Sequence, residues 1–140
     1  MPTILSSGNH PQVRSALQFV VEQKPGWEIC AVATDVLTLL AATGRFCPDL
    51  IILDTELSGL TNWASAPGSH RVDELVHLVH RLCQVSQLVA LSSNPNAQAV
   101  ARSAGMQACV SKSDPPEILI QVLQAVLDAM SLNSTFRRES

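Results

Sequence analysis

The chain has 140 residues, of which 46% are hydrophobic and 15% charged, and its formal net charge is −3. This length fits one domain, and the low charged fraction predicts that much of it is buried or lies at an interface. The acidic balance gives no basic footprint for nucleic acid, and no apolar run reaches the ~18–20 residues that span a bilayer. The N-terminal residues lack the pattern of a secretory signal. We therefore expect a cytoplasmic domain that binds neither nucleic acid nor membrane by itself.

Four cysteines, Cys30, Cys47, Cys83 and Cys109, are widely and irregularly spaced. Three of them lie among apolar residues, where free cysteines are commonly buried. None forms the CxxC pair that is typical of zinc and redox sites. We therefore predict buried free thiols in a reducing compartment, with neither a zinc site nor a disulfide.

Short apolar runs alternate with helical patterns in the first half of the chain. Pro11 suits the first turn of a helix, Asp35 suits a helix cap, and Gly44 is expected to end the helix that follows. In chain order, the patterns predict a strand over Thr3–Ser6, a helix over Pro11–Gln23, a strand over Trp27–Ala33, a helix from Asp35 to about Ala42, and a strand over Leu50–Leu53.

The second half continues the alternation after a loop. The Gly, Pro, Ser and Thr residues of Ser58–Ser69 predict irregular structure. Beyond it, the patterns predict a helix over Arg71–Gln84, a strand over Gln87–Leu91, a helix from Asn94-Pro95 to about Gly105, a strand over Ala108–Ser111, and a helix that begins at Ser113-Asp114-Pro115-Pro116. The order βαβαβαβαβα, with short apolar strands, predicts an α/β domain whose parallel sheet is covered on both faces. We assign residues 1–130 to this domain and 131–140 to a polar tail or linker.

Three polar residues follow strands of the predicted sheet. Asp54 comes after the third strand, Ser92 after the fourth and Lys112 after the fifth. Parallel strands bring their carboxyl ends to one edge, so these residues are expected to converge there. A carboxylate, a hydroxyl and an ammonium group together suit the handling of a phosphoryl group.

The chain resembles the receiver domains of two-component response regulators over about Thr3–Met130. The matching segments are Asn9-His10-Pro11-Gln12-Val13-Arg14, Pro48-Asp49-Leu50-Ile51-Ile52-Leu53-Asp54, Leu91-Ser92-Ser93, and Ala104-Gly105 through Lys112-Ser113-Asp114. They look most like receivers that precede a helix-turn-helix output domain. The resemblance implies a flavodoxin-like (βα)₅ fold, phosphorylation of Asp54 by a histidine kinase or phosphotransfer protein, a switch hydroxyl at Ser92 and a phosphoryl contact at Lys112.

The sequence departs from the receiver pattern where that family binds its metal. Two acidic residues after the first strand normally hold Mg²⁺, and the matching positions here are Gly8 and Asn9. The remaining metal ligands that the resemblance implies are Asp54, Asn9 and the backbone carbonyl of Glu56. Because two charges are missing, we expect Mg²⁺-dependent phosphorylation to be weakened.

Other departures concern the fifth strand and the loop. An aromatic residue that rotates inward on activation is replaced by Cys109, and Ser58–Ser69 is longer than the family's usual connection. Trp63 in this loop either packs onto the domain or marks a partner surface. His77 and His80 are either a metal pair or part of a solvated helix face, and Ser92 could simply satisfy backbone groups at a strand end.

Two functions remain open on the sequence. The first is a receiver that signals by phosphorylation of Asp54, by protein contact, or by both, in a transcription regulator. The second is a phosphorylation-independent pseudo-receiver used for dimerisation or docking. An enzyme is not expected, because no Ser-His-Asp order, Gly-rich phosphate loop or Cys nucleophile motif occurs. The expected partners are a sensor kinase or phosphotransfer protein, an output domain or partner protein, and a second copy of the chain.

Overall fold

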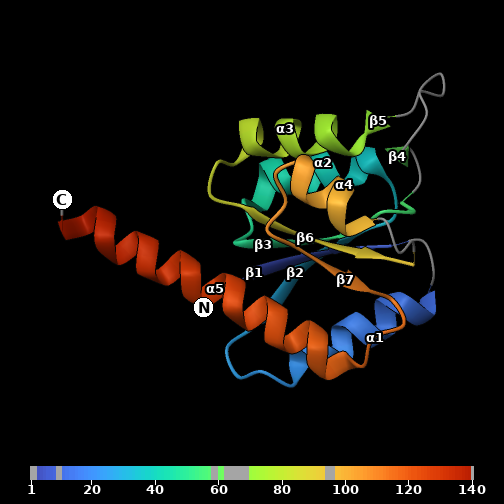
Figure 1. Cartoon of the computed structure of the whole chain (residues 1–140), viewed down its shortest axis with the longest axis horizontal. Helices are drawn as coiled ribbons and strands as arrows, with labels where there is room; N and C mark the ends of the chain where they lie inside the picture. Colours follow the sequence, from blue (N-terminus) through green and yellow to red (C-terminus); the bar gives the residue numbers. More distant parts are fainter. Residues whose placement is uncertain (1–2, 9–10, 58–59, 62–69, 94–96, 140) are drawn as a thin grey trace.

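One parallel sheet of five strands forms the centre of the domain (Figure 1). The computed structural model describes residues 3–8, 11–57, 60–61, 70–93 and 97–139. The sheet has the order β2-β1-β3-β6-β7, with β1 at Thr3–Ser7, β2 at Glu28–Ala33, β3 at Leu50–Asp54, β6 at Gln87–Ser92 and β7 at Ala108–Ser111. The chain winds outward in one direction from β1 and in the other from β3. The predicted doubly wound α/β fold is confirmed, and the point where the direction reverses is where such sheets bind ligands.

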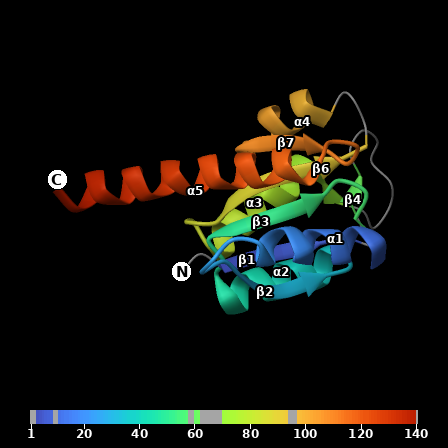
Figure 2. The ribbon, with the colours of Figure 1, turned by 90° about the horizontal axis from the view of Figure 1, so that it is seen from below.

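The five helices of the described residues cover the two faces of the sheet (Figures 1 and 2). One face carries α1 at Pro11–Glu22 and α5 at Pro116–Glu139, and the other carries α2 at Val36–Phe46, α3 at Val72–Leu82 and α4 at Ala97–Ser103. Successive side chains of the central strand β3 point to opposite faces of the sheet and so contribute to both cores. Leu50 and Ile52 belong to the core beneath α1 and α5, and Ile51 and Leu53 to the core beneath the other three helices. All four side chains are fully buried, which explains why this strand is apolar throughout.

Helix α2 begins where the sequence predicts and ends later. The Asp35 carboxylate accepts a hydrogen bond from the Thr38 backbone N–H at 2.7 Å, so it caps the helix. The predicted end at Gly44 is wrong, because the helix continues to Phe46 and Cys47 adopts the left-handed cap with φ 44°. A side chain at Gly44 would instead meet the Cδ2 atom of Leu82 at 3.6 Å. The glycine therefore lies where α2 and α3 pack closely.

Regular structure occurs within and beside the predicted loop and in the predicted tail or linker. Within and beside the predicted loop Ser58–Ser69, β4 at Leu60–Thr61 pairs in parallel with β5 at His70–Arg71; Trp63 lies outside the described residues. The predicted tail is helical, because α5 continues to Glu139 and its second half extends beyond the body of the domain (Figure 2). None of the described helices combines the length and hydropathy needed to cross a membrane.

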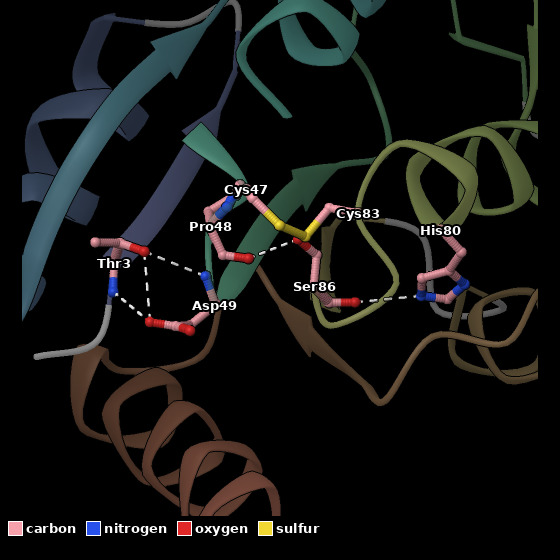
Figure 3. The surroundings of a disulfide bond; sticks show 7 residues. All are labelled: Thr3, Cys47, Pro48, Asp49, His80, Cys83 and Ser86. Atoms are coloured by element: carbon pink, nitrogen blue, oxygen red, sulfur yellow. Dashed lines mark hydrogen bonds between the residues drawn. A yellow bond between two sulfur atoms is a disulfide. The ribbon is translucent and has the colours of Figure 1, made fainter. Parts of the chain in front are cut away.

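The prediction of free thiols is wrong for two of the four cysteines. Cys47 and Cys83 form a disulfide, with Cα atoms 5.5 Å apart (Figure 3). Cys30 and Cys109 are free and half-buried, and burial raises the pKa of both thiols. The disulfide could not be read from sequence spacing, because it depends on two helices whose ends meet only in the folded domain.

Candidate functional site

Asp54 lies at the carboxyl end of β3 and is 1% exposed. Its backbone N–H donates to the Ser7 hydroxyl at 3.0 Å, and that hydroxyl donates to the Ile52 carbonyl at 2.9 Å. Ser7 is the last residue of β1, so this hydroxyl joins the two central strands beside the carboxylate. The sequence pattern did not point to Ser7, although its position at the end of the first strand was an available signal.

Lys112 forms an ion pair with Asp54. Its ammonium Nζ lies 2.9 Å from Asp54 Oδ1, and the Lys112 side chain is only 15% exposed. The Lys112 backbone N–H donates to the Ser92 carbonyl at 2.9 Å, which continues the pairing of β7 with β6 past the strand end. The sheet therefore brings together the carboxylate and the ammonium group that the sequence places 58 residues apart.

Glu56 is the third charged member of the site. Its Oε2 atom lies 2.8 Å from Lys112 Nζ, and its Oε1 atom accepts a hydrogen bond from the Ser93 hydroxyl. The Glu56 backbone N–H also donates to Asp54 Oδ1 at 2.9 Å. The sequence predicted a backbone carbonyl from Glu56 as a metal ligand and left open whether its side chain reaches the pocket; the structure places that carboxylate across the pocket. Ser93 belongs to the Leu91-Ser92-Ser93 match, but its local sequence does not indicate this contact with Glu56.

The second carboxylate oxygen of Asp54 has no hydrogen-bond partner among the described residues. Asp54 Oδ2 is buried, whereas Oδ1 receives both the Lys112 ammonium and the Glu56 backbone N–H. Buried polar atoms are nearly always paired in folded proteins, so an unpaired carboxylate oxygen needs an explanation, such as a ligand or a reacting group. Oδ2 is thus the Asp54 oxygen that no described residue satisfies.

The two carboxylates change the protonation of Lys112. Burial lowers the pKa of the Lys112 ammonium, but the hydrogen bonds and negative charges of Glu56 and Asp54 outweigh burial. The net effect is a pKa above the usual 10.5. Lys112 is therefore charged at neutral pH and neutralises one of the two carboxylates.

The raised pKa of Lys112 is open to direct measurement, because the chain contains only two lysines. In a titration of the Lys Cε signals by nuclear magnetic resonance, the Lys112 signal should shift with a midpoint above pH 10.5. The stabilisation by the ion pair is then fully present below pH 10.5 and is lost as the pH rises through the folded-state pKa. A Lys24→Arg variant assigns the two signals, and a midpoint at or below 10.5 would contradict the ion pair.

Ser92 and Cys109 lie on the α4 side of the same edge. Ser92 is 3% exposed and pairs in register with Ser111 of β7. A groove of about 320 Å³ lies beside them; its lining is polar apart from the thiol and comprises Ser92, Ser93, Gln98, Cys109, Ser111, Ser113 and Asp114. The structure thus places a small side chain, Cys109, beside the predicted switch hydroxyl.

The described residues do not fit a Mg²⁺ site. Gly8 follows β1 and offers only backbone atoms, and Asn9 lies outside the described residues. Asp54 and Glu56, the two carboxylates of the pocket, both form ion pairs with Lys112. A Mg²⁺ ion would have to compete with the Lys112 ammonium group for these carboxylate ligands. Within the described part of the chain, no cluster of three metal-binding side chains occurs. His77 is exposed, and the His80 Nε2 atom lies 3.2 Å from the Ser86 carbonyl.

Comparisons of the sequence identify no relative: no family model matches it, and no curated protein matches it significantly. The fold does have close counterparts among solved structures. A LuxR-family two-component response regulator from Aurantimonas superposes with a TM-score of 0.76 at 21% identity, covering 100% of this chain and 99% of that one. The response regulator domain of Thermotoga maritima CheB gives a TM-score of 0.72 at 16% identity, covering 94% and 97%.

A longer response regulator shows how such a domain occurs within a larger chain. RcsB of Salmonella typhimurium superposes with a TM-score of 0.74 at 16% identity, and the match covers 92% of this chain but 60% of that one. The strand order and the helix layers agree with this likeness. The chain therefore has the fold of a two-component response regulator receiver domain.

Proposed function

We propose that the chain is a signalling receiver domain of a two-component system, with Asp54 as the phosphoryl acceptor. The observation that carries the proposal is the pair of Asp54 oxygens: Oδ1 is held by Lys112, and Oδ2 is buried without a partner among the described residues. A fixed carboxylate with one unpaired oxygen beside an ammonium group suits nucleophilic attack on phosphorus. The receiver fold supports the same assignment.

The reaction would pass a phosphoryl group from a phosphohistidine of a kinase or phosphotransfer protein to Asp54. Oδ2 forms the new O–P bond while the P–N bond to imidazole breaks, and the imidazole nitrogen keeps the bonding pair and takes a proton. Lys112 would neutralise the negative charge on the transferred oxygens. The Glu56 carboxylate already neutralises part of the positive charge of Lys112. We therefore expect the transfer of the phosphoryl group to be slow.

A pseudo-receiver is the second candidate, and the contacts of Glu56 favour it. Glu56 joins Lys112 and Ser93 across the pocket, so the Lys112 ammonium group already pairs with two carboxylates of the domain itself. Such a domain would act by binding an output domain, a partner protein or a second copy of the chain. A pseudo-receiver of this kind would catalyse no reaction.

Phosphorylation of the purified chain by acetyl phosphate separates the two candidates. Intact mass is followed over time with Mg²⁺ and with excess chelator. We expect slow addition of one phosphoryl group, insensitive to Mg²⁺ and absent in Asp54→Asn. Glu56→Gln removes one negative charge from Lys112 and should speed the addition by up to about tenfold, which corresponds to roughly 1.4 kcal/mol.

Two results would decide against the acceptor role. If neither the wild type nor Glu56→Gln gains mass, the pseudo-receiver is the better description. If an adduct forms equally in Asp54→Asn, another residue is the acceptor. Gln18→Glu, a charge change on the exposed side of α1, serves as a matched control that should leave the rate unchanged.

A further inference from the structure

The disulfide joins the carboxyl ends of two neighbouring helices (Figure 3). It lies near the amino end of β3, whereas Asp54 is the last residue of that strand. Cys47 directly follows α2 and Cys83 directly follows α3. The Cys47 N–H donates to the Thr43 carbonyl at 3.0 Å, and the Cys83 N–H donates to the Val79 carbonyl at 2.8 Å. Helix hydrogen bonds thus fix both backbones. The Cα separation of 5.5 Å lies within the ~4.4–6.8 Å that a disulfide requires, so the thiols can pair without rearrangement of the helices.

The two cysteines differ in their access to solvent. Cys47 is exposed, whereas Cys83 is only 4% exposed. The residues next to them in sequence include exposed apolar side chains: Phe46 is 44% exposed, Leu82 50% and Val85 52%. An incoming thiolate can therefore approach Cys47 more readily than Cys83, so Cys83 is the leaving group.

We propose that Cys47 and Cys83 are a reversible redox site that exchanges with a dithiol reductant. The reductant's thiolate attacks Sγ of Cys47, the Cys47–Cys83 bond breaks, and Cys83 leaves as a thiolate that takes a proton. The second thiolate of the reductant then attacks the reductant's other sulfur, which is bonded to Cys47 in the mixed disulfide. Cys47 leaves as a thiolate and takes a proton. The chain gains two electrons and two protons, and the dithiol becomes a disulfide. A disulfide such as oxidised glutathione reverses the reaction.

Hydrogen bonds near the disulfide would keep the neighbouring strands together after the disulfide is reduced. The Ser86 hydroxyl donates to the Pro48 carbonyl (Figure 3). The Gln87 N–H donates to the Asp49 carbonyl at 3.0 Å. The Asp49 carboxylate accepts from the Thr3 N–H at 2.9 Å. These bonds hold β1, β3 and β6 together without the disulfide. Reduction is therefore expected to free the ends of α2 and α3 while the sheet stays formed.

Thiol counting under native conditions tests the proposal. The full chain is equilibrated with mixtures of reduced and oxidised dithiothreitol, quenched in acid, and its free thiols are alkylated and counted by mass. We expect the count to rise from two to four without denaturant and to return to two with oxidised glutathione. Cys30→Ser and Cys109→Ser should lower both counts by one and leave the transition unchanged. Cys47→Ser combined with Cys83→Ala should remain at two under all mixtures.

Hydrogen exchange locates the change. Reduction should increase exchange at residues 44–47 and 82–86 and leave β3 protected. The proposal is overturned if the disulfide yields to reductant only in denaturant, since the pair is then a permanent crosslink. It is also overturned if the reduced native chain does not re-form the disulfide with oxidised glutathione, or if exchange rises equally across the sheet.

Discussion

Removal of the disulfide by Cys47→Ser with Cys83→Ala is expected to lower the free energy of unfolding by about 4 kcal/mol. The two cysteines are 36 residues apart in sequence, and the estimate follows from the loop-closure entropy that a crosslink of this length removes from the unfolded chain. For a domain of this size the loss corresponds to a fall in Tm of roughly 10–15 °C. Thermal and denaturant unfolding of the oxidised wild type and the variant measure it.

The reduced wild type is the matched control for this change. It keeps all four sulfur atoms, so its difference from the oxidised chain isolates the crosslink from the loss of packing at buried Cys83. Cys109→Ser, which keeps the disulfide, should unfold close to the wild type. If the oxidised wild type and the double variant unfold together, the crosslink adds no stability.

Loss of the positive charge in Lys112→Met is expected to lower the free energy of unfolding by about 2–3 kcal/mol at pH 7. Removing one partner of a fully buried ion pair costs ~3–5 kcal/mol, and the figure is reduced here because Lys112 is 15% exposed. The cost arises at Asp54, which is 1% exposed and would be left with no cation. Glu56 is 47% exposed and can be hydrated instead.

A double-mutant cycle isolates the Asp54–Lys112 interaction. Asp54→Asn removes the charge that needs Lys112, so Asp54→Asn with Lys112→Met should be more stable than Lys112→Met alone. Chemical denaturation of the four proteins gives the coupling energy. A coupling near zero would mean that the ion pair does not stabilise the site. The same variants report on phosphorylation, since neither Asp54→Asn variant should accept a phosphoryl group.

The two sites lie at opposite ends of the same strand. Cys47 comes three residues before β3, and Asp54 is the last residue of β3. The part of the chain between the two cysteines therefore contains Asp54, Glu56 and all of α3. If both proposals hold, the phosphoryl site lies at the carboxyl end of β3 and the redox site lies just before its amino end.

The sequence alone predicted the elements whose pattern is local. Four consecutive apolar residues before Asp54 predicted a buried strand with an acid at its end, because a strand covered on both faces needs apolar side chains in both directions. The order of strands and helices then predicted the parallel sheet, and with it the meeting of Asp54 and Lys112 at one edge.

Contacts between elements were decided only by the tertiary structure. Gly44 was expected to end a helix, but it lies within α2 beside Leu82 of α3. The direction of the Glu56 side chain depends on Lys112 and Ser93, which come from other strand ends. The pairing of Cys47 with Cys83 depends on how closely two helices pack. The local spacing of residues therefore determined the fold and the place of Asp54 at a strand end. The ion pairs of Asp54 and the disulfide depend on distances between side chains in the folded domain, which the separation of residues in sequence does not encode.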